Sequence, residues 1–556
     1  MAQRAVSLQF APNDTTKLGF KTMNSPTNRR TAARRLRQEA AEAEFLEPLP
    51  LHANNGDEAR YPNKIGNSTK GLAHDSHTGE VIPGAYDALL DALKSGDPTD
   101  FEALATGGHL GCKVATERRR FVNPQSGYAF DLEGIDSHQL VMPPAPAFAS
   151  AEEAGEMVEL YWMALLRDVS FAEYTTNPIA LAAADDLSKL TDFRGPRVAG
   201  RVTPQVLFRD VYPGCEIGPY ISQFLLQPVN FGAQAIDTRI LTNAPASDFL
   251  TTFTDWLDVI NGCQPTPYPP GIGIGPRVYC YNGRALSQYV HTDVLFQAYF
   301  VACLNLLGNT YPADLGNPYG PFIDHTGTGL PLPKGVSGTL ADIGFGTFGA
   351  PAIATLVCEP ASRALKHQWF QKWLVHRRLR PEEFGGHVEV QRLGRGNYPF
   401  HSDLFNSSVL NQIFSKYGAH LLPIAFPEGS PLHTAYGSGH ATVAGACVTM
   451  LKAFFEGSAI IKNPVVPDPN NPAALIPYVA PAGEPPLTVE GELNKLASNI
   501  SQGRNIAGVH WRTDATEANK LGENVAISML SDMRGLYNEA FYGFSLTRFD
   551  GTTITV

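Results

Sequence analysis

Hydrophobic residues at helical spacing dominate this chain of 556 residues, whereas runs that alternate polar and apolar residues are few. In the segment after Ala151, for example, Met157, Leu160 and Tyr161 fall on one helix face. We predict helices over Ala151–Ala184, Asp248–Ile260, Ala285–Leu307, Ala350–Leu379, His440–Glu456, Leu487–Val509 and Thr513–Asn538. This pattern predicts a mainly α protein, a helical bundle with minor β structure.

The N-terminal part of the chain differs from this helical remainder. Residues 1–60 are an extension, in which Asn28–Glu47 is a helical stretch, basic first and then acidic, with too few large apolar residues to pack by itself. This arm either stays solvated or wraps a neighbouring subunit. We expect residues 61–200 to be a helical and loop region that packs on the core, with a short helix at Ala85–Lys94, and residues 201–556 to be the helical-bundle domain.

Charge and composition exclude several classes of function. The net charge of −11 argues against a partner that is nucleic acid or an anionic membrane, so an anion site here must be a local basic pocket. Met1–Phe10 lacks the apolar core of a secretory signal, and the apolar run Val294–Leu307 is too short to span a bilayer. A soluble protein, cytoplasmic by default, is the prediction.

The seven cysteines show neither CxxC nor zinc-type spacing. Buried thiols are the first expectation, because free cysteine packs like a small apolar residue. Cys263 and Cys280 lie in loop-like sequence, and an oxidising compartment would allow them to bridge.

Two segments gather basic and small residues around predicted helix ends. Lys372 belongs to a basic stretch that ends at Arg380-Pro381, and the proline predicts that the helix stops near Leu379. Taken alone, this is an ordinary solvated helix end. In the second segment, Ser438-Gly439-His440 precedes a run of small apolar residues. Ser438 is the expected N-cap of a buried helix, whose free amides suit either simple capping or an anion.

A third segment places Arg504 six residues before His510. That spacing aligns poorly on a continuous helix, so we expect Gly508 to allow a break. Asp514 is placed to accept a hydrogen bond from one ring nitrogen of His510, which would leave the other nitrogen free to act. A lone pair of this kind is more often structural than catalytic.

Together the three segments resemble the vanadium-dependent haloperoxidases of the acid phosphatase superfamily. The family pattern is Lys then Arg-Pro, Ser-Gly-His, and Arg–five residues–His–three residues–Asp, and the last spacing matches in full. The gap between Lys372 and Arg380 is one residue longer than the commonest form and is similar to the red-algal bromoperoxidases. Gly437 and Gly503 stand where many members have Pro and Ser. Pro213–Leu226 and Val290–Tyr299 also resemble the algal and bacterial branch.

The resemblance implies an enzyme that uses vanadate and hydrogen peroxide to oxidise halide to hypohalous acid, which halogenates small organic nucleophiles. His510 would be the axial vanadium ligand, and His440 the acid/base group at the apical oxygen. Lys372 would also polarise the bound peroxide. The residues expected to hold the vanadate oxygens are Lys372, Arg380, Ser438, Gly439 and Arg504.

Further residues bear on halide choice and on the surroundings of the site. The resemblance implies a bromide preference from His433, with iodide easier and chloride weaker, whereas Trp369 is either a halide contact or core packing. Asp293 is a lone acid in an apolar helix and is expected to pair with Arg504 or Arg380. Calcium, held by Asp342 and loop carbonyls, is a second cofactor that the relatives suggest.

Two rival functions stay open at this point. On the same scaffold a phosphatase would use His510 as a nucleophile and His440 as the acid for the leaving group. A non-catalytic oligomeric protein would use the same residues to hold a structural anion. Large homo-oligomers are what the algal resemblance implies.

Overall fold

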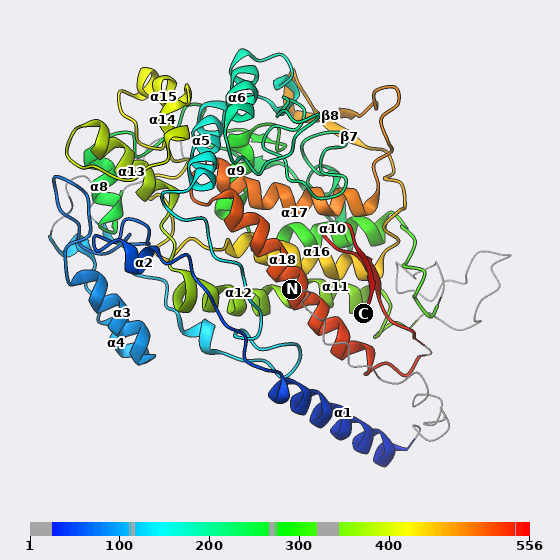
Figure 1. Ribbon diagram of the computed structural model, residues 1–556. Coiled ribbons are helices and arrows are strands. Elements are labelled where there is room, and N and C mark those ends of the chain that lie inside the picture. Colours follow the sequence, from blue (N-terminus) through cyan, green and yellow to red (C-terminus); the bar gives the residue numbers. More distant parts are fainter. Residues whose placement is uncertain are drawn as a thin grey trace.

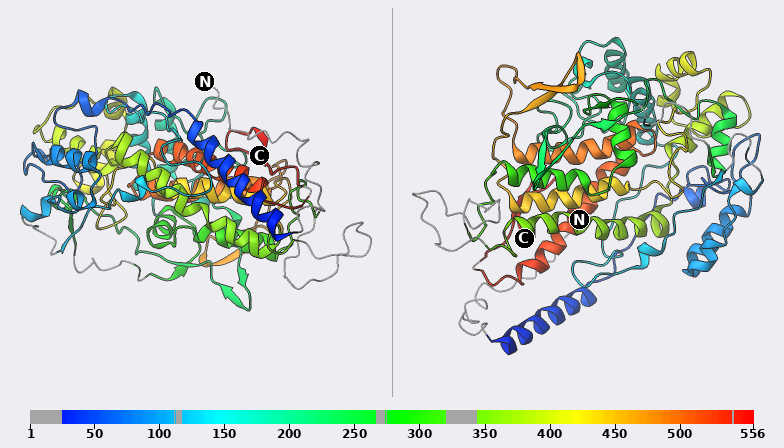
Figure 2. Two further views of the ribbon diagram at one scale, coloured as in Figure 1. Left: turned by 90° about the horizontal axis from the view of Figure 1, so that it is seen from below. Right: turned by 180° about the vertical axis from the view of Figure 1, so that it is seen from behind.

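The computed structural model describes residues 25–110, 112, 117–265, 273, 275–319, 344–539 and 541–556. Its centre is the helix α16 (Gly439–Phe454), which lies between α17 (Val489–Ile506) and α12 (Pro360–Phe370) and is crossed by α18 (Arg512–Arg534) (Figures 1 and 2). One continuous apolar core runs through this bundle and through the helices around it. The predicted mainly α class is confirmed.

Two glycines allow α16 and α18 to approach closely. A Cβ atom on Gly445 would lie 2.0 Å from the carbonyl oxygen of Asn519, and one on Gly522 would lie 1.9 Å from that of Thr442. Neither position tolerates a side chain without a shift of the backbone. This contact packs the N-terminal half of α16 against the N-terminal half of α18, and the second and third sequence motifs lie just before these two halves.

The remaining elements surround this centre. The other helices are α1 (Pro26–Leu46), α2 (Asp57–Arg60), α3 (Ala85–Ser95), α4 (Pro98–Glu102), α5 (Ala151–Leu166), α6 (Pro178–Lys189), α7 (Gln223–Leu226), α8 (Phe253–Ile260), α9 (Gly283–Thr292), α10 (Gln297–Gly308), α11 (Ala350–Cys358), α13 (Pro381–Arg392), α14 (Ser402–Asn406) and α15 (Val409–Tyr417). Short 3-10 turns are η1 (Gly107–Leu110), η2 (Gln125–Tyr128) and η3 (Phe171–Glu173), and η4 (Gln371–His376) is a π-helix. The strands form antiparallel pairs: β1 (Glu117–Arg118) with β5 (Cys263–Gln264), β2 (Val229–Phe231) with β3 (Gln234–Ile236), β4 (Ile240–Leu241) with β6 (Arg277–Val278), β7 (Val465–Asp468) with β8 (Asn471–Pro477), and β9 (Ser545–Thr547) with β10 (Thr553–Thr555).

Two of the predicted long helices are broken, and these predictions were wrong. The segment Ala151–Ala184 stops at the end of α5 and restarts at α6, because Asn177 caps a new helix whose first residue is a proline. Ala285–Leu307 divides into α9 and α10, which are bent by 101° at Asp293. Periodicity could not show this break, since the apolar pattern continues across it.

Two further boundaries also differ from the prediction. Ala350–Leu379 comprises α11, α12 and η4, and the helical run stops at His376, before the predicted Leu379. The helix predicted from Asp248 starts at Phe253, and its N-cap is Thr252, whose hydroxyl accepts from the amide of Asp255. The predicted helices at Asn28–Glu47 and Ala85–Lys94 are confirmed as α1 and α3.

The cysteine prediction needs a correction. Cys263 is bonded to Cys112, a residue 151 positions earlier, and Cys280 is a buried free thiol. Loop-like sequence around Cys263 and Cys280 gave no information about which pair lies close together.

Within the described ranges, no single helix has both the length and the apolar character of a membrane span, and only the bent pair α9 and α10 reaches such a composition jointly.

Candidate functional site

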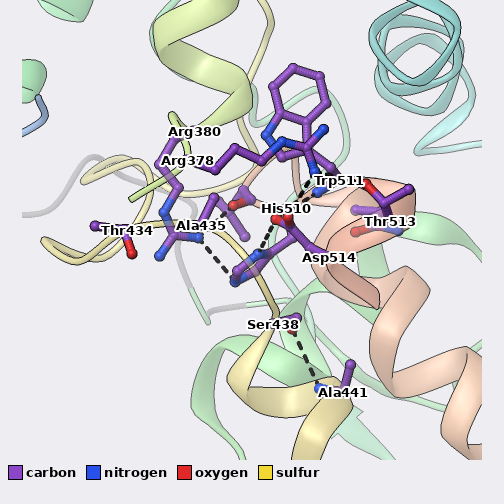
Figure 3. A network of polar contacts seen from close by, with 12 residues as sticks. Arg378, Arg380, Thr434, Ala435, Ser438, Ala441, His510, Trp511, Thr513 and Asp514 are labelled. Atoms are coloured by element: carbon purple, nitrogen blue, oxygen red, sulfur yellow. Dashed lines mark hydrogen bonds and ion pairs between the residues drawn. The ribbon is translucent and has the colours of Figure 1, made fainter. Parts of the chain in front are cut away.

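Five elements bring the three motifs to one place in the bundle. Lys372 lies in the π-helix η4, Arg380 is the N-cap of α13, and Ser438 is the N-cap of α16. Arg504 lies in the last turn of α17, and His510 lies in the short turn between α17 and α18. The guanidinium and imidazole groups of Arg380 and His510 point toward one another, with Ser438 close by (Figure 3).

The break after α17 sets the direction of His510. Gly508 has a φ of +85°, a left-handed conformation that glycine adopts without strain, so the expected break before His510 is confirmed. His510 Nδ1 lies 2.7 Å from a carboxylate oxygen of Asp514, which is the predicted contact. Since a carboxylate only accepts, Nδ1 carries the proton and Nε2 keeps its lone pair. Arg380 Nη1 donates to that Nε2 at 2.9 Å.

Three cations lie in this pocket without a carboxylate partner among the described residues. The side chains of Lys372, Arg380 and Arg504 are all buried. Lys372 Nζ donates to the carbonyl oxygens of Thr434 at 2.8 Å and Ala435 at 2.9 Å. These contacts orient the ammonium group but do not neutralise it, because the partners are uncharged.

The pKa values show the electrostatic cost of this arrangement. Burial, and then the charges of Arg380 and Arg504, holds the pKa of Lys372 well below its ordinary value. Burial lowers the pKa of Arg380 to about 10 and that of Arg504 to about 10. Because burying an unpaired charge is costly, the arrangement favours a bound anion that pairs with all three groups.

The guanidinium group of Arg504 has protein contacts at some of its atoms and, within the described ranges, lacks a partner at its Nε. Its Nη1 donates to the carbonyl oxygen of Val290 at 2.8 Å, and its guanidinium carbon lies 5.4 Å from the ring centre of Phe426. Its Nε is buried and has no hydrogen-bond partner in the part of the chain that the structure describes. A buried donor without a partner indicates a ligand that supplies an acceptor.

The helix α16 begins at the pocket. Ser438 caps it, with the hydroxyl accepting from the amide of Ala441 at 3.4 Å, and the Ser438 amide donates to the carbonyl oxygen of Asp514 at 2.9 Å. The next residue, Gly439, is the first of the helix, so its amide is one of the free donors at a positive helix end.

His440 pairs with a carboxylate that the sequence assigned to another partner. Its Nε2 lies 3.0 Å from Asp293 Oδ1, whereas Asp293 was expected to pair with Arg504 or Arg380. That prediction was wrong, because the bend between α9 and α10 turns Asp293 toward the start of α16. Burial lowers the pKa of His440, and the charge of Asp293 opposes this shift.

The two residues expected to bear on halide choice lie next to each other. The ring centres of Trp369 and His433 are 4.9 Å apart. Arg380 Nη2 donates to Nδ1 of His433 at 3.0 Å, and the indole nitrogen of Trp369 donates to the carbonyl oxygen of Asn123 at 3.1 Å. Burial, and then the charges of Lys372 and Arg380, holds the pKa of His433 well below its ordinary value, so its ring is neutral.

Sequence reasoning missed Arg378, which pairs with the Asp514 oxygen that does not contact His510. Its Nη1 donates to Asp514 Oδ1 at 2.9 Å (Figure 3). Its Nη2 bonds to Glu153 and, at 2.7 Å, to Glu156. The guanidinium also lies 4.7 Å from the Trp511 ring. One sequence signal was available: Glu153 and Glu156 lie three residues apart on the otherwise apolar face of α5, and buried acids of this kind require a cationic partner.

Asp342, the residue predicted to bind calcium, lies outside the described residues. Among the described residues, no group of three or more carboxylate, histidine or cysteine side chains is arranged to hold a cation.

Comparisons with known proteins show which family this chain resembles. The family model of the VCPO second helical-bundle domain matches residues 413–539. A vanadium-dependent bromoperoxidase from Corallina pilulifera is 35% identical, over 91% of this chain and 93% of its own length. One from Ascophyllum nodosum is 32% identical, over 87% and 85%. The homohexameric structure of the second vanadate-dependent bromoperoxidase from Ascophyllum nodosum is 29% identical, covers 95% of this chain and 90% of its own, and superposes with a TM-score of 0.84.

Proposed function

The chain belongs to the family of vanadium-dependent bromoperoxidases, and on that premise we propose that its cationic pocket holds vanadate for the oxidation of bromide by hydrogen peroxide. The single observation that carries this proposal is the set of three buried cations, Lys372, Arg380 and Arg504, without a carboxylate partner among the described residues. A small, highly charged oxyanion would satisfy all of them at once.

The donor set fits vanadate better than a simple structural anion. The lone pair of His510 Nε2 points into the same pocket, so this nitrogen would bind the central atom and exchange its contact with Arg380 for it. The oxygens would be held by the three cations, with Ser438 and the Gly439 amide adding hydrogen bonds. When bound, vanadium(V) acts as a Lewis acid that activates peroxide for attack by halide.

The chain's own residues would manage the protons of this reaction. Peroxide, halide and one proton give hypohalous acid and water, so a proton must be supplied. His440 is neutral in the free protein because burial lowers its pKa, and this allows it to accept a proton from incoming peroxide. The carboxylate of Asp293 would stabilise the imidazolium that forms. Lys372 would polarise the peroxide by its charge.

The expected preference for bromide over chloride depends on His433 and Trp369, which lie beside Arg380. A neutral His433 ring bonded to Arg380 would weaken the positive field that a small, strongly hydrated chloride needs. We therefore expect bromide and iodide to be oxidised more readily than chloride. Trp369 would supply the apolar wall of the halide position.

The experiment loads the purified protein with orthovanadate and follows bromination of a dye in peroxide and bromide. We expect vanadate-dependent bromination that His510→Ala abolishes and that His420→Ala, a half-buried histidine bonded to Glu389, leaves intact. Cleavage of p-nitrophenyl phosphate by the vanadium-free protein, without bromination, would favour a phosphatase. If the protein shows neither bromination nor phosphate-ester cleavage, the non-catalytic anion-binding protein is the function that the result supports.

The N-terminal arm supports assembly with further copies of this chain. Helix α1 contributes no buried residue, and Phe45 in its last turn and Leu49 and Leu51 just after it are exposed apolar residues. We expect this arm to pack on a neighbouring copy. The double variant Phe45→Ser, Leu49→Ser should lower the mass measured by light scattering, and an unchanged mass would argue that the arm is solvated.

A further inference from the structure

A cavity of about 460 Å³ has Asp293 in its lining, whereas none of the three cations of the cationic pocket lines it. Helix α9 lines it with Gln288 and Tyr289, the C-cap Asp293 adds its carboxylate, and the pair β4–β6 contributes Ile240 and Arg277. Small-molecule sites commonly have volumes of roughly 300–1,000 Å³. The cavity is therefore large enough for a compact organic molecule.

The inner end of the cavity adjoins His440 through its hydrogen-bond partner Asp293. Asp293 lines the cavity and bonds to His440 at 3.0 Å, so a molecule held there would lie one residue away from the vanadate pocket. Gln288 also lines the cavity and is only 5% exposed. The Asp293 carboxylate offers an acceptor at this end of the cavity for a ligand that brings a donor, such as a hydroxyl group.

The outer end of the cavity carries positive charge. Arg239 is paired with Asp237 at 2.9 Å, whereas the exposed Arg277 has no carboxylate ion pair among the residues that the structure describes. At this end two arginines face one carboxylate, that of Asp237, which leaves a local excess of one positive charge on a protein whose net charge is −11; the other acid in the described lining, Asp293, lies at the inner end. A planar guanidinium of this kind binds carboxylates in a bidentate manner.

Apolar side chains lie between these two ends. Ile240 and Val301 contribute aliphatic walls, and the ring of Tyr289 is largely buried. A hydroxyl acceptor at the inner end, an apolar middle and a free cation at the outer end match a molecule with the same order of groups. That order is a phenol hydroxyl, an aromatic ring and a carboxylate.

We propose that this cavity binds the organic molecule that is halogenated, and that it selects electron-rich phenols carrying a carboxylate. The inference rests on the proposed function, which supplies hypohalous acid at the neighbouring pocket. The aromatic carbon attacks the halogen, a carbon–halogen bond forms, and the oxygen–halogen bond breaks. The leaving hydroxide takes up the proton lost from the ring carbon and becomes water, so atoms and electrons balance.

The first test measures binding without chemistry. The full-length protein, loaded with vanadate and kept free of peroxide, is titrated calorimetrically with 3-(4-hydroxyphenyl)propanoate and with its uncharged methyl ester. We expect the acid to bind at least about fivefold more tightly than the ester. Arg277→Ala should remove this preference by weakening the binding of the acid alone. The control Arg201→Ala alters an exposed arginine that pairs with Asp185, and it should change neither affinity.

The second test compares products. Acid and ester compete in one vessel with peroxide and bromide, and reagent hypobromite gives the reference ratio of brominated acid to brominated ester. We expect the enzyme to raise this ratio at least about threefold and Arg277→Ala to return it to the reference. Equal affinities, or a ratio equal to that of the reagent, overturns the proposal. Selective binding without any bromination would instead count against the proposed function alone.

Discussion

The substitution Asp514→Asn tests whether the pair behind His510 prepares it to bind vanadium. Asp514 accepts from His510 Nδ1 at 2.7 Å and from the Trp511 amide at 3.1 Å with one oxygen, and from Arg378 at 2.9 Å with the other. Asparagine keeps the shape but has one oxygen and one NH2 group. In either orientation the NH2 group faces a donor, so at least one contact of the aspartate is lost.

The expected magnitude follows from these contacts. Loss of a hydrogen bond to a charged group costs about 1.5–3 kcal/mol. Loss of the partner that orients a metal-binding histidine typically lowers metal affinity about 10–100-fold, or about 1.4–2.8 kcal/mol. The two ranges agree, so we expect the vanadate dissociation constant of Asp514→Asn to rise about 10–100-fold. Arg378 keeps Glu153 and Glu156, and the loss of stability should therefore stay below the about 3–5 kcal/mol of a stranded buried charge.

The assay titrates vanadium-free protein with orthovanadate and reads both bound vanadium after dialysis and restored bromination. The matched control is Asp248→Asn, which removes the charge of a buried carboxylate paired with Arg167 and Arg284. It should lose stability but keep vanadate affinity. A folded Asp514→Asn protein that binds vanadate as tightly as the parent would refute the reasoning.

Three further predictions concern protons and the disulfide. Asp293→Asn removes the carboxylate that raises the pKa of His440, so the limb of the pH–rate profile that reports His440 should move to lower pH; an unmoved limb would show that His440 titrates independently of Asp293. Burial and neighbouring cations lower the pKa of Lys372, and a bound oxyanion should raise it again. Vanadate binding should then take up protons and weaken as pH rises, which calorimetry in buffers of different ionisation enthalpy measures, with allowance for vanadate's own titration; binding without proton uptake would contradict this. Cys112→Ser should lower stability by about 2–4 kcal/mol under oxidising conditions, because the bond to Cys263 closes a long loop, and a reductant should abolish the difference between the two proteins.

Much of the site was predictable because its chemistry is carried by local motifs. Ser438 caps α16 as its position before a small apolar run predicts, and Gly508 breaks the chain before His510 as the spacing requires. The contact between His510 and Asp514 spans four residues, which is one helical turn. Features of this kind depend on neighbours in the sequence, so their residues and spacing were sufficient to identify them.

The sequence alone therefore determined the helical class, the family and the residue types of the anion site. Only the tertiary structure decided that Asp293 pairs with His440 instead of Arg504, that Arg378 supports Asp514, and that Cys263 bonds to Cys112. Each of these contacts joins residues more than a hundred positions apart. Helical periodicity reports which face of a segment is buried, but partners of this kind depend on how segments bend and cross, which a local pattern does not contain.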